Sequence, residues 1–83
     1  MATPEAKIQR LARTIVADFF LYNQDKIDKG LLNDDFFERL EGEIDDSVAF
    51  FREHAGGKLE VFWDTLFNRL MQREAKLLEM KES

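Results

Sequence analysis

The fold of this chain is organised around the segment Leu11–Ile27, LARTIVADFFLYNQDKI. At about 100° per residue, apolar positions in and around it cover about half the circumference of a helix. These positions are Ile8, Leu11, Ala12, Ile15, Val16, Phe19, Phe20, Tyr22 and Ile27. A helix that packs on one neighbour typically has a narrower apolar stripe. We therefore expect this helix to be wedged between at least two other elements.

The length and composition describe one small domain that needs additional stabilisation. A chain of 83 residues buries only about 60–65% of its unfolded surface, and small domains often rely on disulfides, metals or association. There is no cysteine and one histidine, which excludes disulfides and thiolate metal sites and argues against an imidazole-rich zinc site. Association with another chain is the remaining way to stabilise the domain.

The charge and hydropathy exclude two classes of partner. The formal net charge is −5, whereas binding to phosphate backbones requires clustered Lys and Arg. No apolar run approaches the roughly 20 residues of a membrane-spanning helix. The N-terminal MATPEAK lacks the basic leader and apolar core of a signal peptide. We expect a cytoplasmic protein that binds neither nucleic acid nor membrane.

Apolar periodicity predicts three helices, at about residues 4–29, 34–55 and 58–81, within a single domain 1–83. Thr3 is the expected cap of the first helix, with Pro4 at its first position. No segment has the period-two alternation of a strand. The predicted fold is all-α: a three-helix bundle with a long first helix, associating into a helical dimer.

Glycine and asparagine define the predicted boundaries. We expect Gly30 to end the first helix in the left-handed conformation, and Gly56-Gly57 to end the second. Asn33 is the expected cap of the second helix, with Leu32 and Phe37 at hydrophobic-staple spacing. The apolar stripe predicted for the second helix is Phe37, Leu40, Ile44, Val48, Phe51 and Ala55.

The third helix has a broad apolar arc interrupted by charge. Its apolar residues span half of the helix circumference, and Arg73 and Glu74 fall inside that arc. Leu66, Leu70, Arg73, Leu77 and Met80 have the spacing of a short coiled-coil seam, in which a charged residue can set the register. The alternative is that the end of this helix overhangs the bundle and frays.

The first half of the chain resembles a short helical module found at the C-termini of larger bacterial proteins. The features that carry this resemblance are Leu11-Ala12-Arg13, the apolar-acidic run Ile15 to Phe19, Leu21-Tyr22-Asn23, and the exit Lys26 to Gly30. The match extends from about residue 6 to residue 51 and does not include the third helix. It implies an appended interaction module, with no catalytic residues.

No residue pattern predicts a metal or catalytic site. A calcium loop with Asp25 at its first position and Gly30 at its sixth would place Ile27, Lys29 and Phe36 at positions that require oxygen ligands.

The dense carboxylates of the second helix lie off its apolar stripe, so we interpret them as a solvated face. His54 is expected at a helix end, where positive charge is favourable. Asp18 is expected to make a structural polar contact.

Adjacent phenylalanines are the strongest functional signal. Phe19-Phe20, Phe36-Phe37 and Phe50-Phe51 each place two rings about 100° apart on a helix, which is more apolar surface than one small bundle covers. We assign Phe37 and Phe51 to the core. The predicted interface comprises Val16, Phe20, Leu21, Ile27, Phe36, Phe50, Trp63, Phe67, Met71, Arg73, Glu74 and Leu78.

The sequence therefore favours a non-enzymatic helical interaction module that forms a homodimer, without cofactor or metal. Two alternatives remain open. One is a small acidic adaptor that binds a different protein as a monomer, and the other is a carrier of an apolar ligand. A nucleophile–base pair or cofactor motif, which an enzyme would require, is not recognisable.

Overall fold

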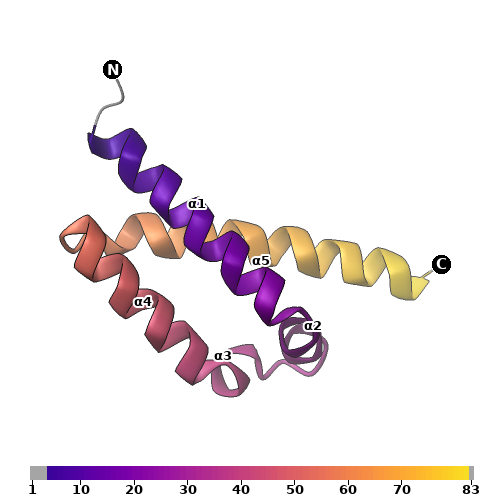
Figure 1. Ribbon diagram of the computed structural model, residues 1–83. Helices are drawn as coiled ribbons and strands as arrows, with labels where there is room; N and C mark the ends of the chain where they lie inside the picture. The colour runs from indigo at the N-terminus through magenta and orange to yellow at the C-terminus, as the bar shows by residue number, and fades with distance from the viewer. Residues whose placement is uncertain (1–3, 83) are drawn as a thin grey trace.

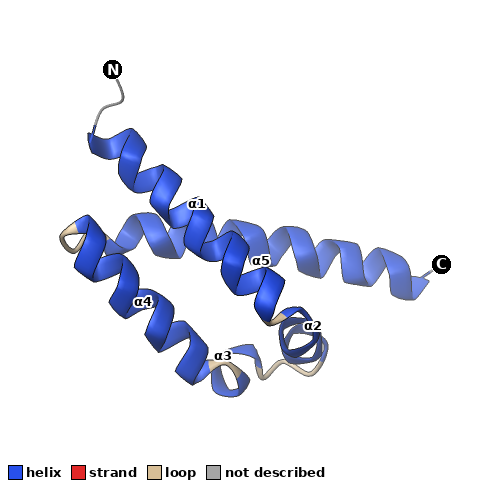
Figure 2. Cartoon of the chain, in the orientation of Figure 1, coloured by secondary structure: helices blue, strands red, loops and turns tan. Residues whose placement is uncertain are grey.

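The computed structural model describes residues 4–82, and the predicted cap Thr3 lies outside them. The described chain is all-α and contains no strand (Figure 2). It has five helices, two more than predicted: α1 (Pro4–Tyr22), α2 (Gln24–Leu32), α3 (Phe36–Arg39), α4 (Glu41–Ala55) and α5 (Leu59–Glu82). None of these helices has the length and apolar character that crossing a membrane requires.

Helix α1 packs against both α4, which runs beside it, and α5, which crosses behind it in Figure 1, as the breadth of its apolar arc predicts. Its residues Ala12, Val16 and Phe19 are buried. The core continues through α2 to α5, and its remaining members include Ile27, Leu40, Ile44, Phe51, Phe62, Leu66 and Leu70. Tyr22 is an exception to the predicted arc, because the helix ends there and the side chain is 79% exposed.

The first helix breaks at Asn23, so the predicted continuous helix 4–29 is wrong. Asn23 has φ −125° and ψ 25°, outside helical geometry. Its backbone N–H and its Nδ2 both donate to the carbonyl of Phe19, at 3.1 and 3.0 Å. An Asn side chain competes with the backbone for such hydrogen bonds. The break turns α2 away from the α1 axis, and Ile27 is fully buried in the new direction.

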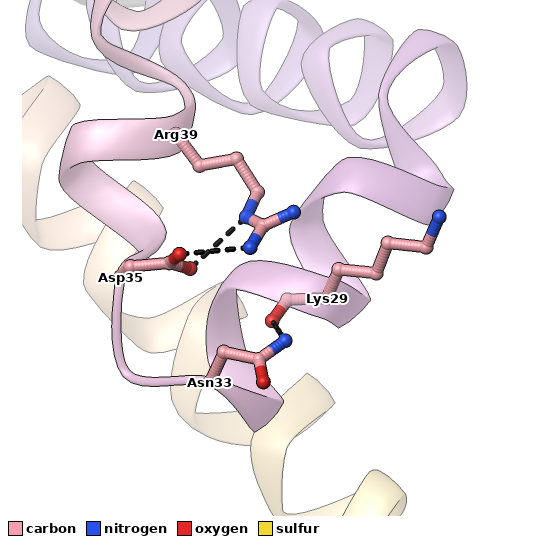
Figure 3. Close-up of polar contacts among 4 residues, drawn as sticks. All are labelled: Lys29, Asn33, Asp35 and Arg39. Carbon is pink, nitrogen blue, oxygen red and sulfur yellow. Dashed lines mark hydrogen bonds and ion pairs between the residues drawn. The ribbon is translucent and has the colours of Figure 1, made fainter.

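Gly30 does not end a helix. It lies inside α2, is buried, and contacts the backbone of Phe36. The helix ends two residues later, where the backbone N–H and Nδ2 of Asn33 donate to the carbonyl of Lys29 at 3.0 and 2.7 Å (Figure 3). The left-handed residue of this turn is Asp34, with φ 58°. Asn33 therefore closes α2 rather than opening the next helix.

The second predicted helix is also divided. Leu40, with φ −114° and ψ 18°, separates the single turn of α3 from α4. Leu40, Ile44 and Phe51 are buried as predicted. Phe37 is 50% exposed and Phe36 only 6%, the reverse of the prediction.

The reversal has a local cause. Phe36 is the first residue of α3 and packs against Gly30, which leaves its neighbour Phe37 facing outward. The predicted staple between Leu32 and Phe37 does not constrain this turn, since both residues are half-exposed. Gly56-Gly57 ends α4 as predicted, with φ values of 69° and 102°.

Candidate interaction surface

Helix α5 carries two parallel stripes of large apolar residues. The inner stripe, Phe62, Leu66, Leu70 and Leu77, is buried. The outer stripe is the same pattern displaced by one residue: Trp63, Phe67, Met71 and Leu78. Because one residue is about 100° of rotation, the second stripe faces away from the core. Trp63 is partly buried, and the other three side chains are 44–61% exposed.

Phe37 of α3 joins this outer stripe to form an aromatic patch, which we define as Phe37, Trp63 and Phe67. The Phe37 and Phe67 ring centroids are 6.0 Å apart, and the Trp63 and Phe67 rings stack at 5.9 Å. Sequence reasoning missed Phe37 because the turn before α3 sets its direction. A contiguous exposed apolar patch normally marks an interaction site.

Carboxylates border the aromatic patch. A surface hollow of about 330 Å³ lies beside it, lined by Phe37, Glu38, Glu41, Ile44, Asp45 and Trp63. Asp64, on the next position of α5, is exposed. The part of the surface around Trp63 is therefore apolar at its centre and negative at its edge.

Arg73 forms an ion pair with Asp28 of α2 within its own chain. Its Nε and Nη2 donate to the two carboxylate oxygens at 2.8 and 2.7 Å. The side chains are 22% and 23% exposed. The hydrogen bonds to Asp28 raise the pKa of the Arg73 guanidinium above its ordinary value. The partner lies 45 residues away in sequence, so local spacing gives no signal for it. Beyond this pair, α5 remains helical to Glu82.

Apart from Arg73, the predicted interface residues fall into three groups in the structure. Val16, Phe20, Ile27 and Phe36 are 9% exposed or less and belong to the protomer's own core. Their expected exposure is wrong, because α5 packs on both α1 and α2, Phe36 packs on Gly30, and Arg69 lies over the Phe20 ring. Leu21 and Phe50 are exposed, each at a different surface hollow beside α1. Trp63, Phe67, Met71, Glu74 and Leu78 lie on the outer face of α5.

Leu21 lies at a cleft of about 550 Å³ between α1 and α5. The guanidinium carbon of Arg69 is 5.4 Å from the centre of the Phe20 ring in this cleft. Gln24, Gln72, Arg73 and Lys76 line the rest, with Asp18 on the α1 side. This cleft is polar and predominantly basic.

Phe50 lies at a groove of about 370 Å³ between α1 and α4, which also includes Tyr22. Its acidic residues are Asp18, Glu43 and Asp46. His54 stacks on Phe50, with ring centroids 4.2 Å apart, and its Nδ1 is 2.9 Å from the Phe50 carbonyl oxygen. His54 thus lies in the last turn of α4, as predicted.

The remaining polar contacts connect neighbouring elements. Arg39 donates to both oxygens of Asp35, at 3.0 and 2.8 Å (Figure 3). Lys26 donates to Glu43 at 2.9 Å. These hydrogen bonds lower the pKa of the Asp35 and Glu43 carboxyl groups. Asp18 is exposed.

Nothing in this arrangement of the described side chains points to a metal site. Within residues 4–82, no group of three or more His, Asp or Glu side chains is placed to hold a metal ion. Comparison of the chain with family models, with curated proteins and with solved structures finds no match. The outer face of α5 is therefore the feature from which a function can be argued.

Proposed function

We propose that this chain is a non-enzymatic helical interaction module that associates with a second copy through the aromatic patch and the outer face of α5. One observation carries the proposal. Phe37, Phe67, Met71 and Leu78 remain 44–61% exposed after the chain has formed its own core. They lie on two helices at one surface, with Phe37 and Phe67 in ring contact.

The magnitude of this surface is sufficient for association. Four half-exposed side chains of this size present roughly 350 Å² of apolar area per chain, and burial contributes about 25 cal/mol per Å². Two chains would together gain about 18 kcal/mol gross, against association costs of about 4–15 kcal/mol. The difference, about 3–14 kcal/mol, spans millimolar to sub-nanomolar dissociation constants, with the micromolar range near its middle.

Sedimentation equilibrium over a dilution series from about 1 to 100 µM tests the proposal. We expect twice the mass of one chain at the upper end of this range. Phe67→Glu should give the monomer mass with unchanged helicity, since Phe67 is half-exposed and the new charge would lie in the contact. Leu21→Glu is the matched control, because Leu21 is exposed on another surface. A wild-type chain that stays monomeric throughout would refute self-association.

A second candidate function is an adaptor that binds a basic segment of a different protein. The groove between α1 and α4 favours it, because Tyr22 and Phe50 lie there beside Asp18, Glu43 and Asp46. A cationic peptide would find apolar contacts and complementary charge in the same place. Asp46→Lys should abolish such binding, and the variant should keep the oligomeric mass of the wild type.

The structure offers less support for a carrier of an apolar ligand. Such a ligand needs a largely enclosed apolar pocket. The clefts on either side of α1 are open, and charged side chains line both.

A further inference from the structure

We propose that the second copy binds antiparallel, so that the C-terminal half of α5 of each chain covers the aromatic patch of the other. This inference rests on the proposed self-association and adds the orientation and the register. It follows from the spacing of exposed residues, from the distribution of charge along α5, and from the shape of the molecule.

The outer face of α5 has a heptad spacing of four and three residues. All seven members of this outer seam are exposed: Glu60, Asp64, Phe67, Met71, Glu74, Leu78 and Lys81. Alternate steps of four and three are the spacing at which one helix packs along another. The inner stripe, with steps of four, four and seven residues, is already used by the protomer's own core. The outer seam is therefore a second, unpartnered packing face on the same helix.

Charge along the outer seam is asymmetric. Its N-terminal end carries Glu60 and Asp64, its centre Glu74, and its C-terminal end Lys81. In a parallel pair in register, each of these residues would face its own copy, and like charges would repel at every charged layer. In an antiparallel pair, the acidic end of one outer seam meets Lys81 of the other. Electrostatics thus favours the antiparallel orientation.

One antiparallel register pairs six of the seven outer-seam residues and leaves Glu60 beyond the overlap. It places Asp64 opposite Lys81 of the second copy, Phe67 opposite Leu78, and Met71 opposite Glu74. Each layer occurs twice, because a dimer of identical chains has a two-fold axis. The two Phe67–Leu78 layers flank two central Met71–Glu74 layers, and an ion pair of Asp64 with Lys81 closes each end. Each chain thus contributes one charge near the centre, Glu74, which would lower stability somewhat and select this register over its neighbours.

The surroundings fit the same arrangement. The C-terminal end of α5 projects beyond α2, where a second chain can reach it (Figure 1). In this register Leu78 of the second copy lies on Phe67, next to Phe37 and Trp63. Lys81 of that copy then meets Asp64, the residue after Trp63, which itself lines the hollow with Glu38, Glu41 and Asp45. The negative edge of the patch and the Lys81 side chain have complementary charge.

Single-cysteine variants test the orientation cleanly, because the chain has no cysteine of its own. Asp64→Cys and Lys81→Cys are oxidised under mild conditions, each alone and as an equimolar mixture. A disulfide requires Cα atoms about 4.4–6.8 Å apart. In the proposed register, positions 64 and 81 face each other, whereas two copies of position 64 are separated by 17 residues, or about 25 Å. Leu21→Cys mixed with either variant measures random collision.

We expect covalent dimer from the mixture well above the Leu21→Cys background, and background levels from each variant alone. Dimer from each variant alone, at a higher yield than from the mixture, would indicate a parallel pair and overturn the inference, while self-association would stand. Background cross-linking throughout, with a dimeric mass in sedimentation, would place the contact on another face and also overturn it. A monomeric mass would refute the proposed function itself, and the orientation with it.

Discussion

Substitution of Gly30 by alanine tests the packing that directs the second half of the fold. In most helix interiors this change stabilises by about 1 kcal/mol, since alanine loses less backbone entropy. At Gly30, however, the added Cβ would lie 2.8 Å from the Cα of Phe36 and 3.3 Å from its Cβ. The first of these neighbours is backbone, so a change of rotamer cannot relieve the contact. Helices α2 and α3 would have to separate.

Moving α3 away from α2 would lower the stability of the fold. Phe36 is 6% exposed and its ring lies 6.3 Å from that of Phe19, so moving α3 outward disturbs the core. Overpacking of this kind costs about 1–3 kcal/mol. We expect Gly30→Ala to lower the free energy of unfolding by that amount, and to lower Tm by about 5–20 °C for a domain of this size.

Gly42→Ala is the matched control. Gly42 lies in the first turn of α4 and is not in the left-handed region, and a Cβ added to it would have no heavy atom of another element within 4 Å. The same chemical change should therefore raise stability there, by up to about 1 kcal/mol. Urea unfolding followed by circular dichroism and by Trp63 fluorescence, at one fixed protein concentration, measures both variants. A Gly30→Ala chain as stable as the wild type would refute the packing argument.

Three other features of the protomer can be tested through its stability. Arg73→Leu should lower stability by about 1 kcal/mol by leaving Asp28 unpaired, and a raised Tm would instead favour a seam role for Arg73. The pKa values of the Asp35 and Glu43 carboxyl groups are lowered in the folded chain by hydrogen bonds from basic partners. The unfolded chain therefore takes up protons at a higher pH, and the free energy of unfolding should fall as the pH drops below about 4.5. The midpoint of urea unfolding, measured at a series of acidic pH values, tests this. Phe51→Ala, at a side chain with 0% exposure, should cost about 3–5 kcal/mol and unfold most of this small domain, whereas cooperative unfolding at the wild-type midpoint would contradict its place in the core.

Local periodicity in the amino-acid sequence was enough to predict one part of the fold. The all-α class, the wedging of α1 between two neighbours and the end of α4 at Gly56-Gly57 all follow from apolar spacing and strong breakers. Core residues in long regular stretches, such as Ala12 and Leu66, were predictable for the same reason. Their burial depends only on which face of a helix they occupy.

Directions between helices were settled only by tertiary packing. The break at Asn23 reorients α2, and the contact of Gly30 with Phe36 fixes the start of α3. Because α3 starts at Phe36, that side chain is buried and the next one, Phe37, is exposed. The ion pair of Asp28 with Arg73 likewise joins residues 45 positions apart. Apolar periodicity specifies the buried face of a helix to within about one residue, or about 100° of rotation. The surface available to a partner depends on a finer choice, namely which of two adjacent side chains is already covered by the chain's own packing.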